Sequence, residues 1–268
     1  MIGNTDALTA YDASAKPETT LYIPLQFWFC RNPGLALPLI ALQYHEVKFN
    51  ITFASFDSLV VGTAPSSVPS LGYASLYVDY IYLDTDERRQ FAQVQHEYLI
   101  EQLQYTGAES FTNQSVKSKL ALNHPCKELI WVAQPNANIS SKYTSVYGVN
   151  SAGSYPNLTV TQSVVDAKLQ LNGHDRFSIR DGDYFNLVQP YQHHTRIPST
   201  GIYVYSFALN PEQHQPSGTV NMSRIDNATL LLTLWSGVTS SGCQLRVYAV
   251  NYNVLRVMSG MGGLAYSN

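Results

Sequence analysis

Two long apolar runs, residues 21–53 and residues 202–234, repeat one order of elements along the chain. Each run opens with an aromatic-rich segment that predicts a strand, is stopped by Asn-Pro, and closes with alternating apolar and polar residues. The corresponding pieces are residues 21–30 and 202–209, Asn32-Pro33 and Asn210-Pro211, and residues 47–53 and 228–234. Self-similarity at this long spacing indicates a duplicated β domain rather than a short-period solenoid.

Other segments with apolar or alternating patterns predict further strands. They are residues 39–53, 76–83, 97–106, 116–123, 128–134, 164–172, 177–180, 184–188 and 245–258. The pattern of residues 97–106 also fits a helix. Asn172-Gly173 is a hairpin turn signal, because both residues adopt the positive φ angles of a tight turn.

The remaining segments are polar or rich in turn residues. Residues 84–95 carry helix formers after an Asp-Thr-Asp-Glu start, which predicts a capped helical turn that links two domains. Residues 135–162 predict a long exposed loop, and loops of this length are commonly functional surfaces. Residues 259–268 predict a flexible tail.

The strand count indicates how the chain divides into domains. From residue 97 onward about eight strands are predicted, which matches an eight-stranded jelly roll. Before residue 84 only about three or four are predicted, so the first jelly roll is incomplete and would leave unpaired edges. We therefore expect a polar N-terminal arm at 1–20, the C-terminal strands of a first jelly roll plus a linker at 21–90, and a second jelly roll at 91–268. The chain is expected to be the C-terminal part of a longer protein, or a fragment that needs partner strands.

Composition agrees with an all-β protein that has large buried or self-associating surfaces. Hydrophobic residues make up 45% of the chain, charged residues 13%, and there are 19 tyrosines. The net charge of −3 and the absence of a Lys/Arg cluster argue against a nucleic-acid partner. The three cysteines, Cys30, Cys126 and Cys243, are far apart and odd in number, which argues against a disulfide framework or a zinc site. Residues 1–20 are polar and predict no signal peptide, and no apolar run reaches the length expected of a membrane span.

Several ordered segments carry a family resemblance. They are PLQFWFCRNPGLALPLIALQYHEVKF, VDYIYLDTDERRQFAQVQHEYLIEQLQ, LNHPCKELIW, LQLNGHDRF, YFNLVQPYQ, GIYVYSFAL, QPSGTVNMSRIDNATL and YAVNYNVLRVMSGMGGLAY. Together they closely resemble the major capsid proteins of nucleocytoplasmic large DNA viruses, the algal-virus and iridovirus-like group. The likeness runs from Leu21 to the C-terminus, and the early strands of the first jelly roll are absent.

The resemblance implies an all-β double jelly roll and a structural role in the virion. Members of the family form homotrimers, whose pseudo-hexagonal capsomers tile an icosahedral capsid around an internal membrane. Partners would be other copies of the chain and neighbouring capsomers, with minor capsid proteins and the inner membrane side of the virion as further contacts. Assembly in the host cytoplasm, no direct nucleic-acid contact, no enzymatic activity and no cofactor are implied as well.

Residue patterns that could carry chemistry are few, and we assign no catalytic, cofactor-binding or metal residue. Structural roles or solvent exposure account best for the candidate pairs and loops, since none has a further partner at ligand or motif spacing. These candidates are His45-Glu46, His96-Glu97, His193-His194, Asp84-Thr85-Asp86-Glu87 and Gly260-Met261-Gly262-Gly263.

Six Asn-X-Ser/Thr sequons are present, and we assign no glycan to any of them. They begin at Asn50, Asn113, Asn138, Asn157, Asn221 and Asn227. Asn138 and Asn157 are the better candidates because they lie in the predicted long loop. The alternative function is a jelly-roll protein that binds or cleaves glycans, which would need two carboxylates in one cleft or exposed aromatic residues along a groove.

Overall fold

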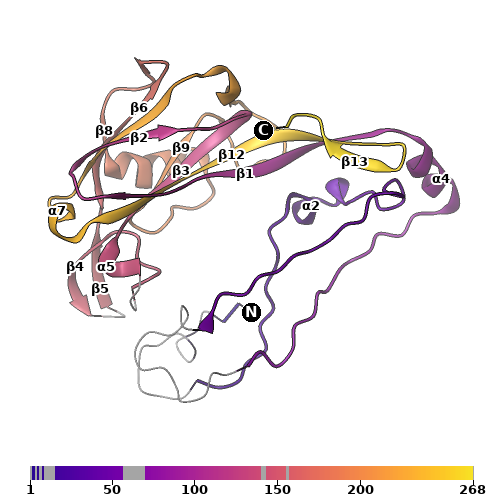
Figure 1. Ribbon diagram of the computed structural model, residues 1–268, viewed down its shortest axis with the longest axis horizontal. Coiled ribbons are helices and arrows are strands. Elements are labelled where there is room, and N and C mark those ends of the chain that lie inside the picture. Colours follow the sequence, from indigo (N-terminus) through magenta and orange to yellow (C-terminus); the bar gives the residue numbers. More distant parts are fainter. Residues whose placement is uncertain are drawn as a thin grey trace. The chain divides into compact units, whose positions relative to one another are not determined.

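The computed structural model describes residues 2–3, 5, 8, 16–56, 70–139, 143–154 and 157–267 (Figure 1). Much of the predicted arm at 1–20 lies outside this part of the chain. The chain divides into two compact units, each with its own set of contacts. The first comprises Met1–Ile23 and Glu101–Tyr252, and the second comprises Pro24–Ile100 and Asn253–Asn268.

Two sheets form the framework of the first unit. One sheet has the strand order β1-β12-β3-β10, with β9 paired to β3 and β13 paired to β12. Its strands are β1 (His96–Phe111), β12 (Cys243–Met258), β3 (Pro125–Pro135), β10 (Val220–Asn221), β9 (Ile202–Ser206) and β13 (Met261–Leu264), of which β13 belongs to the second unit. We call it the β1 sheet.

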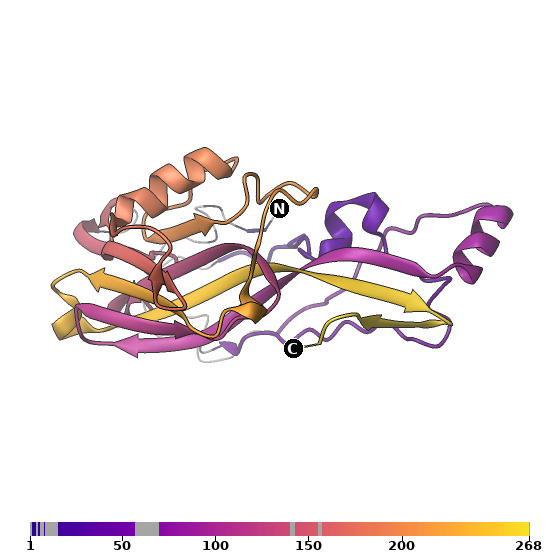
Figure 2. The same ribbon diagram turned by 90° about the horizontal axis from the view of Figure 1, so that it is seen from above.

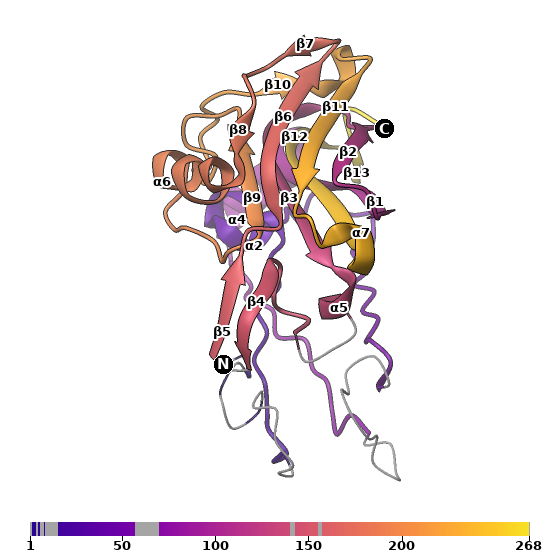
Figure 3. The same cartoon turned by 90° about the vertical axis from the view of Figure 1, so that its left-hand side faces the viewer.

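The other sheet, here the β2 sheet, has the order β2-β11-β6-β7, with β8 also paired to β6 (Figure 3). Its strands are β2 (Ser115–Leu120), β11 (Ala228–Leu234), β6 (Val164–Leu171), β7 (His174–Asp175) and β8 (Arg180–Asp181). A separate hairpin is formed by β4 (Val149–Ser154) and β5 (Asn157–Thr161).

The pairing follows the wrapped order of a jelly roll. The first long strand pairs with the last, β1 with β12, and the second pairs with the one before last, β2 with β11. Between them β3 pairs with β9, and β6 pairs with β8. Eight main strands thus close one complete jelly roll, and both the expected all-β class and the expected second jelly roll are confirmed.

The core lies between the two sheets and follows from strand alternation. In β2, Val116, Ser118 and Leu120 are buried while Lys117 and Lys119 face solvent. The same period buries leucines of β11 and the Leu245, Val247 and Ala249 side of β12. At the centre the fully buried Trp131 contacts Phe185, with ring centroids 5.1 Å apart.

Short helices complete both units, and in the described residues none is long and apolar enough to cross a bilayer. Those of the first unit are α5 (Asn136–Ile139), η2 (Tyr184–Val188), α6 (Gln189–His193), η3 (Met222–Arg224) and α7 (Val238–Ser241). Those of the second are α2 (Trp28–Arg31), η1 (Pro33–Leu35) and α4 (Thr85–Gln93).

Most strands predicted after residue 96 are confirmed. Residues 228–234 match β11 without a shift, and residues 97–106 form a strand, part of β1, rather than the alternative helix. Asn172 and Gly173 make the expected turn, with φ angles of 50° and 82°. The helical turn predicted at 84–95 is also confirmed as α4, whose first turn is capped by Asp84 Oδ1 accepting from the Glu87 N–H at 2.9 Å.

Four predictions in the same region are wrong. Residues 184–188 form the helix η2, because short apolar runs fit both periods and this one leads directly into α6. Of residues 177–180, only Arg180 joins a strand, β8. The long loop at 135–162 contains α5 and the β4–β5 hairpin. The tail at 259–268 contains β13, which pairs with the end of β12 to make a hairpin (Figure 2).

The strands predicted at 21–30, 39–53 and 76–83 are also wrong. The described residues 16–56 and 70–95 contain no strand, and these segments are mostly extended backbone. Their sequence favours strands, but a strand needs a neighbour for its N–H and C=O groups, and the described chain supplies none. The two apolar repeats therefore do not make the same sheet contacts in this structure.

Side chains still bring the first apolar run together within the second unit. Phe27 stacks on Phe29 with centroids 5.0 Å apart, and Phe49 lies 5.9 Å from Phe27. The turn before residue 45 is held by the β12–β13 hairpin, because Tyr44 N–H donates to the Gly260 carbonyl at 2.9 Å. A Cβ at Gly260, whose φ is 80°, would lie 2.4 Å from the Tyr44 ring.

Candidate functional site

The histidine pairs singled out in the sequence serve separate structural contacts. His45 Nδ1 accepts from the Gly262 N–H at 3.3 Å, and His96 Nε2 lies 2.7 Å from the Phe91 carbonyl. His193 Nδ1 lies 2.8 Å from the Leu209 carbonyl. Within the described residues, no group of three or more His, Cys, Asp or Glu side chains is arranged to hold a metal ion.

The acidic residues and the glycine-rich segment singled out in the sequence also have local structural roles. Glu46 pairs with Lys48 at 3.0 Å, and Glu97 pairs with Arg256 at 2.8 Å. Asp86 lies 3.5 Å from Arg89 on the exposed surface of α4, and Gly260 to Gly263 lie in the β12–β13 hairpin. These residues are therefore not gathered into one site.

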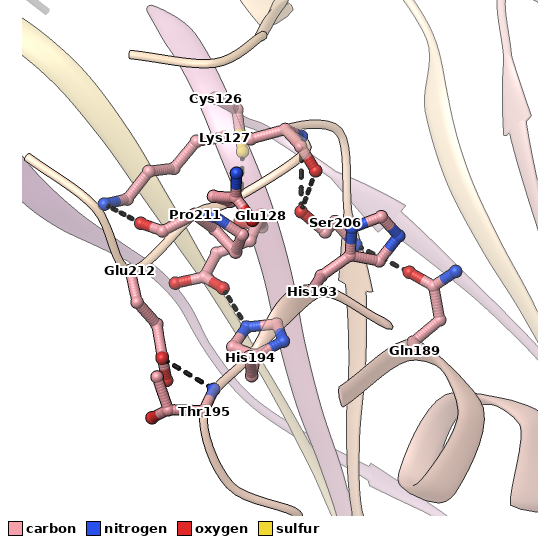
Figure 4. A network of polar contacts seen from close by, with 12 residues as sticks. Cys126, Lys127, Glu128, Gln189, His193, His194, Thr195, Ser206, Pro211 and Glu212 are labelled. Carbon is pink, nitrogen blue, oxygen red and sulfur yellow. Dashed lines mark hydrogen bonds and ion pairs between the residues drawn. The ribbon is translucent and has the colours of Figure 1, made fainter. Parts of the chain in front are cut away.

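The structure instead shows a polar network that sequence reasoning missed, centred on a buried lysine of β3 (Figure 4). The Lys127 side chain is 3% exposed. Its ammonium group lies 2.5 Å from Glu101 Oε1 of β1 and donates to the Pro211 carbonyl at 2.6 Å. The Tyr252 ring of β12 lies 5.4 Å from the same nitrogen. Burying an ammonium group requires this kind of charge and hydrogen-bond compensation.

Glu128, the next residue of β3, fixes the chain that follows α6. Its Oε2 lies 2.7 Å from His194 Nε2, and both side chains are nearly buried. One residue on, the Thr195 N–H donates to Glu212 Oε2 at 2.7 Å. Lys127 and Glu128 thus hold two loops against one strand, and the arrangement stabilises these loops.

The cysteines add no reactive site in the described chain. Cys126 and Cys243 are buried, and Cys30 is exposed; all three are free thiols. Burial raises the pKa of Cys126 to about 12 and that of Cys243 to about 11. Hydrogen bonds to the backbone, at Glu128 for Cys126 and at Phe111 for Cys243, lower these pKa values by less than burial raises them. Thiols of this kind stay protonated and unreactive at neutral pH.

The sequon at Asn138 is closed to modification in the folded state. Asn138 is 3% exposed, and its amide donates to the carbonyls of Val146 and Gly148 at 3.0 and 3.1 Å. The preference for Asn138 is therefore wrong, since its amide serves the loop rather than solvent. Asn50, Asn113, Asn221 and Asn227 are exposed, and the side chain of Asn157 lies outside the described residues.

An open groove of about 650 Å³ lies beside η2. Its lining includes Asp181, Asp183 and Tyr184, together with Val165 and Leu187. These are the residue types that the glycan alternative would need. A glycosidase acid, however, lies in an apolar pocket, whereas both carboxylates here are exposed. The Tyr184 hydroxyl accepts from Gln189, and the Arg180 guanidinium lies 5.6 Å from its ring.

Exposed aromatic and aliphatic side chains are the most unusual surface feature of the second unit. Tyr82 is 91% exposed and Tyr77 is 83% exposed. Others on the extended segments include Leu71, Tyr73, Leu76, Val78, Tyr80 and Ile81, with Ile51 and Phe53 before them. Apolar surface of this extent marks an interaction site.

The family model for the large eukaryotic DNA virus major capsid protein matches residues 87–263, about two thirds of the chain. The chain belongs to this family. A second model, for the major capsid protein N-terminus, matches residues 3–84.

The major capsid protein of Pyramimonas orientalis virus is 54% identical and aligns with 99% of this chain and 66% of its own. That of Phaeocystis pouchetii virus is 50% identical, with 95% and 66% coverage. The chain thus spans just under two thirds of the length of these curated relatives.

A solved capsid protein shares the fold. The PBCV-1 capsid protein, a crystal structure fitted into a reconstruction of the virophage Sputnik, aligns with a TM-score of 0.71 and 39% identity. The alignment covers 92% of this chain and 70% of that one. The capsid family resemblance seen in the sequence is confirmed.

Proposed function

We propose that this chain is a structural building block of the icosahedral capsid of a large DNA virus, and that it works by self-association rather than catalysis. The observation that carries the proposal is the complete jelly roll, shared at 39% identity with the solved capsid protein of PBCV-1. Family membership supports the same role.

The proposed assembly is a homotrimer whose capsomers contact one another in the shell. Extended, strongly exposed apolar segments support it, because the unfavourable hydration of their apolar surface is relieved when another chain covers them. We retain the division into a polar arm at 1–20, the last part of a first jelly roll plus linker at 21–90, and a second jelly roll at 91–268. Minor capsid proteins and the inner membrane side are further proposed partners. We also propose that assembly takes place in the host cytoplasm, and we propose no nucleic-acid partner.

No observation favours the glycan alternative strongly enough to make it a second proposal. The two carboxylates of the groove are exposed, and the strongest polar network binds loops to β3. We therefore propose no catalytic residue, cofactor or metal for this chain.

Electron microscopy of the concentrated, purified chain tests the proposal. Three-fold particles with a pseudo-hexagonal outline are the expected result. Uniform particles of single-chain size, together with binding to an oligosaccharide array, would favour the glycan alternative instead.

A further inference from the structure

Two short motifs of opposite charge lie on opposite edges of the β2 sheet (Figure 3). Lys117-Ser118-Lys119 belongs to β2 at one edge. Asp181-Gly182-Asp183 begins at the end of β8, which lies beyond β11 and β6 at the other edge. Both motifs place two like charges two residues apart.

The edge formed by β2, here the lysine edge, carries two exposed ammonium groups on one face of the sheet. Lys117 and Lys119 are exposed, and the intervening Ser118 is buried with its hydroxyl bonded to Glu109. Alternate residues of a strand point to the same face, about 7 Å apart. Among the ion pairs of the described residues, none within 4.0 Å involves Lys117 or Lys119. Each lysine is therefore available to a second molecule.

Gly182 allows the backbone between the two aspartates to pack closely against the start of β6. A Cβ at that position would lie 2.1 Å from the Val164 carbonyl oxygen, so only glycine lets the backbone pack there. Asp181 and Asp183 flank it, and both are exposed. Asp181 also lies directly opposite Asp166 in the ladder between β8 and β6, and like charges in that position repel.

Local cations and donors compensate this edge only in part. Asp183 Oδ1 accepts from Gln162 Nε2 at 2.8 Å, and within the described residues no hydrogen bond reaches its second oxygen. The neighbouring Arg180 lies over the Tyr184 ring. The edge therefore keeps an excess of negative charge that an external cation would neutralise.

The groove beside these carboxylates has an apolar side. Val165 is 51% exposed and Leu187 is 44% exposed, and both line it together with Asp181 and Asp183. A lysine side chain matches this combination, because its methylene stem packs on apolar surface while its ammonium group seeks a carboxylate.

We propose that the Lys117-Ser118-Lys119 edge of one copy docks into the Asp181/Asp183 groove of a second copy. The contact joins two different surfaces, so repetition produces a ring or an extended array, and a ring results where the rotation closes. Lysines on an edge strand oppose backbone pairing, so side chains rather than a continuous β ladder make this contact. The inference rests on the proposed capsid function and names one of its subunit contacts.

Zero-length cross-linking of the full chain tests the contact directly. A carbodiimide couples an amine to a carboxylate only when the two groups touch, and mixing ¹⁵N-labelled with unlabelled chain separates links between copies from links within one. Peptide mass spectrometry should find isotopically mixed links from Lys117 or Lys119 to Asp181 or Asp183. Oligomers linked only at other positions would overturn this contact and leave the capsid proposal standing. A chain that never forms oligomers would contradict both.

A charge exchange provides the independent test. We expect the double variants K117E/K119E and D181K/D183K each to associate at least tenfold more weakly than the unaltered chain at low salt. An equimolar mixture of the two should recover association, because both contacts between unlike variants are complementary: the glutamate edge meets the lysine groove, and the unaltered lysine edge meets the unaltered aspartate groove. Circular dichroism first shows that both variants keep the native fold. Unchanged association of either variant, or no recovery of association in the mixture, would then overturn the proposal. Raising the salt from about 0.05 to 0.5 M should weaken the native contact, since exposed charges are screened.

Discussion

Lys127 illustrates how much one buried charge can contribute to this fold. Its ammonium group connects β3 to β1 through Glu101 and holds the Pro211 carbonyl of a following loop. Removing one partner of a buried pair leaves the other charge in a poorly solvated place, and this penalty exceeds the net value of the pair.

Replacing Lys127 by methionine should lower the free energy of unfolding by about 3–5 kcal/mol, because Glu101 loses its cation. The matched control is Lys48→Met, which breaks an exposed lysine–glutamate pair at 3.0 Å and should cost less than about 1 kcal/mol. Urea titration of both variants measures the difference. Equal losses would show that burial of the Lys127 pair is unimportant.

The two buried thiols should make the fold sensitive to alkali. Their folded-state pKa values, about 12 for Cys126 and about 11 for Cys243, lie above the ordinary value of 9.0. A raised pKa contributes stability that is complete below pH 9 and is lost as the unfolded chain ionises above it. Each thiol can add up to about 1.4 kcal/mol of loss per pH unit between pH 9 and its folded pKa.

Cys126→Ala should therefore flatten the fall of unfolding free energy between pH 9 and 11, whereas Cys30→Ser should leave it unchanged because Cys30 is exposed. Chemical denaturation at several pH values measures these slopes. A slope unaffected by Cys126→Ala would refute the assigned cause.

Residue-level contacts were the hardest part to predict from sequence. The Lys127 network joins residues 26 and 84 positions apart, and nothing local in KEL indicates that its lysine is buried. A charged residue inside an otherwise apolar strand pattern was the one available signal.

At the scale of elements, one tyrosine connects the two sheets. Tyr203 of β9 is fully buried, and its hydroxyl accepts from the N–H groups of Ser163 and Val164, both at 2.9 Å. Burial raises its pKa, which keeps the hydroxyl neutral over the physiological range. The contact positions the start of β6 against β9.

Tyr203→Phe should destabilise the fold because two buried N–H groups lose their acceptor, at about 1–3 kcal/mol for each. Tyr248→Phe, on the half-buried outer side of β12, should change stability by less than about 0.5 kcal/mol. Thermal melts of the two variants, compared with the parent chain, measure the effect. A Tyr203→Phe melt at the parent temperature would contradict this role.

Element predictions succeeded where both the pattern and a pairing partner were present. The alternation in residues 228–234 and the Asn172-Gly173 turn identified β11 and a hairpin, since β2 and β6 lie on either side of β11. Residues 76–83 have an equally strong strand pattern but no partner in the described chain. The pattern of apolar residues indicates only that a segment prefers an extended conformation. Whether it becomes a strand depends on a second segment that can pair with its N–H and C=O groups.

At the scale of the whole molecule, exposed apolar surface is the feature that most requires another chain. Burying one large aromatic or aliphatic side chain contributes about 1.5–3 kcal/mol. Tyr77, Ile81 and Tyr82 are all more than half exposed. Several such residues together correspond to the whole stability of a typical domain, about 5–15 kcal/mol.

The native mass of the purified chain at several concentrations tests self-association most directly. We expect a mass three times that of the 29.8 kDa chain, with the exposed tyrosines of residues 73–82 protected from solvent. A soluble 29.8 kDa monomer at every concentration, melting in one sharp transition that includes the Trp28 fluorescence, would contradict it.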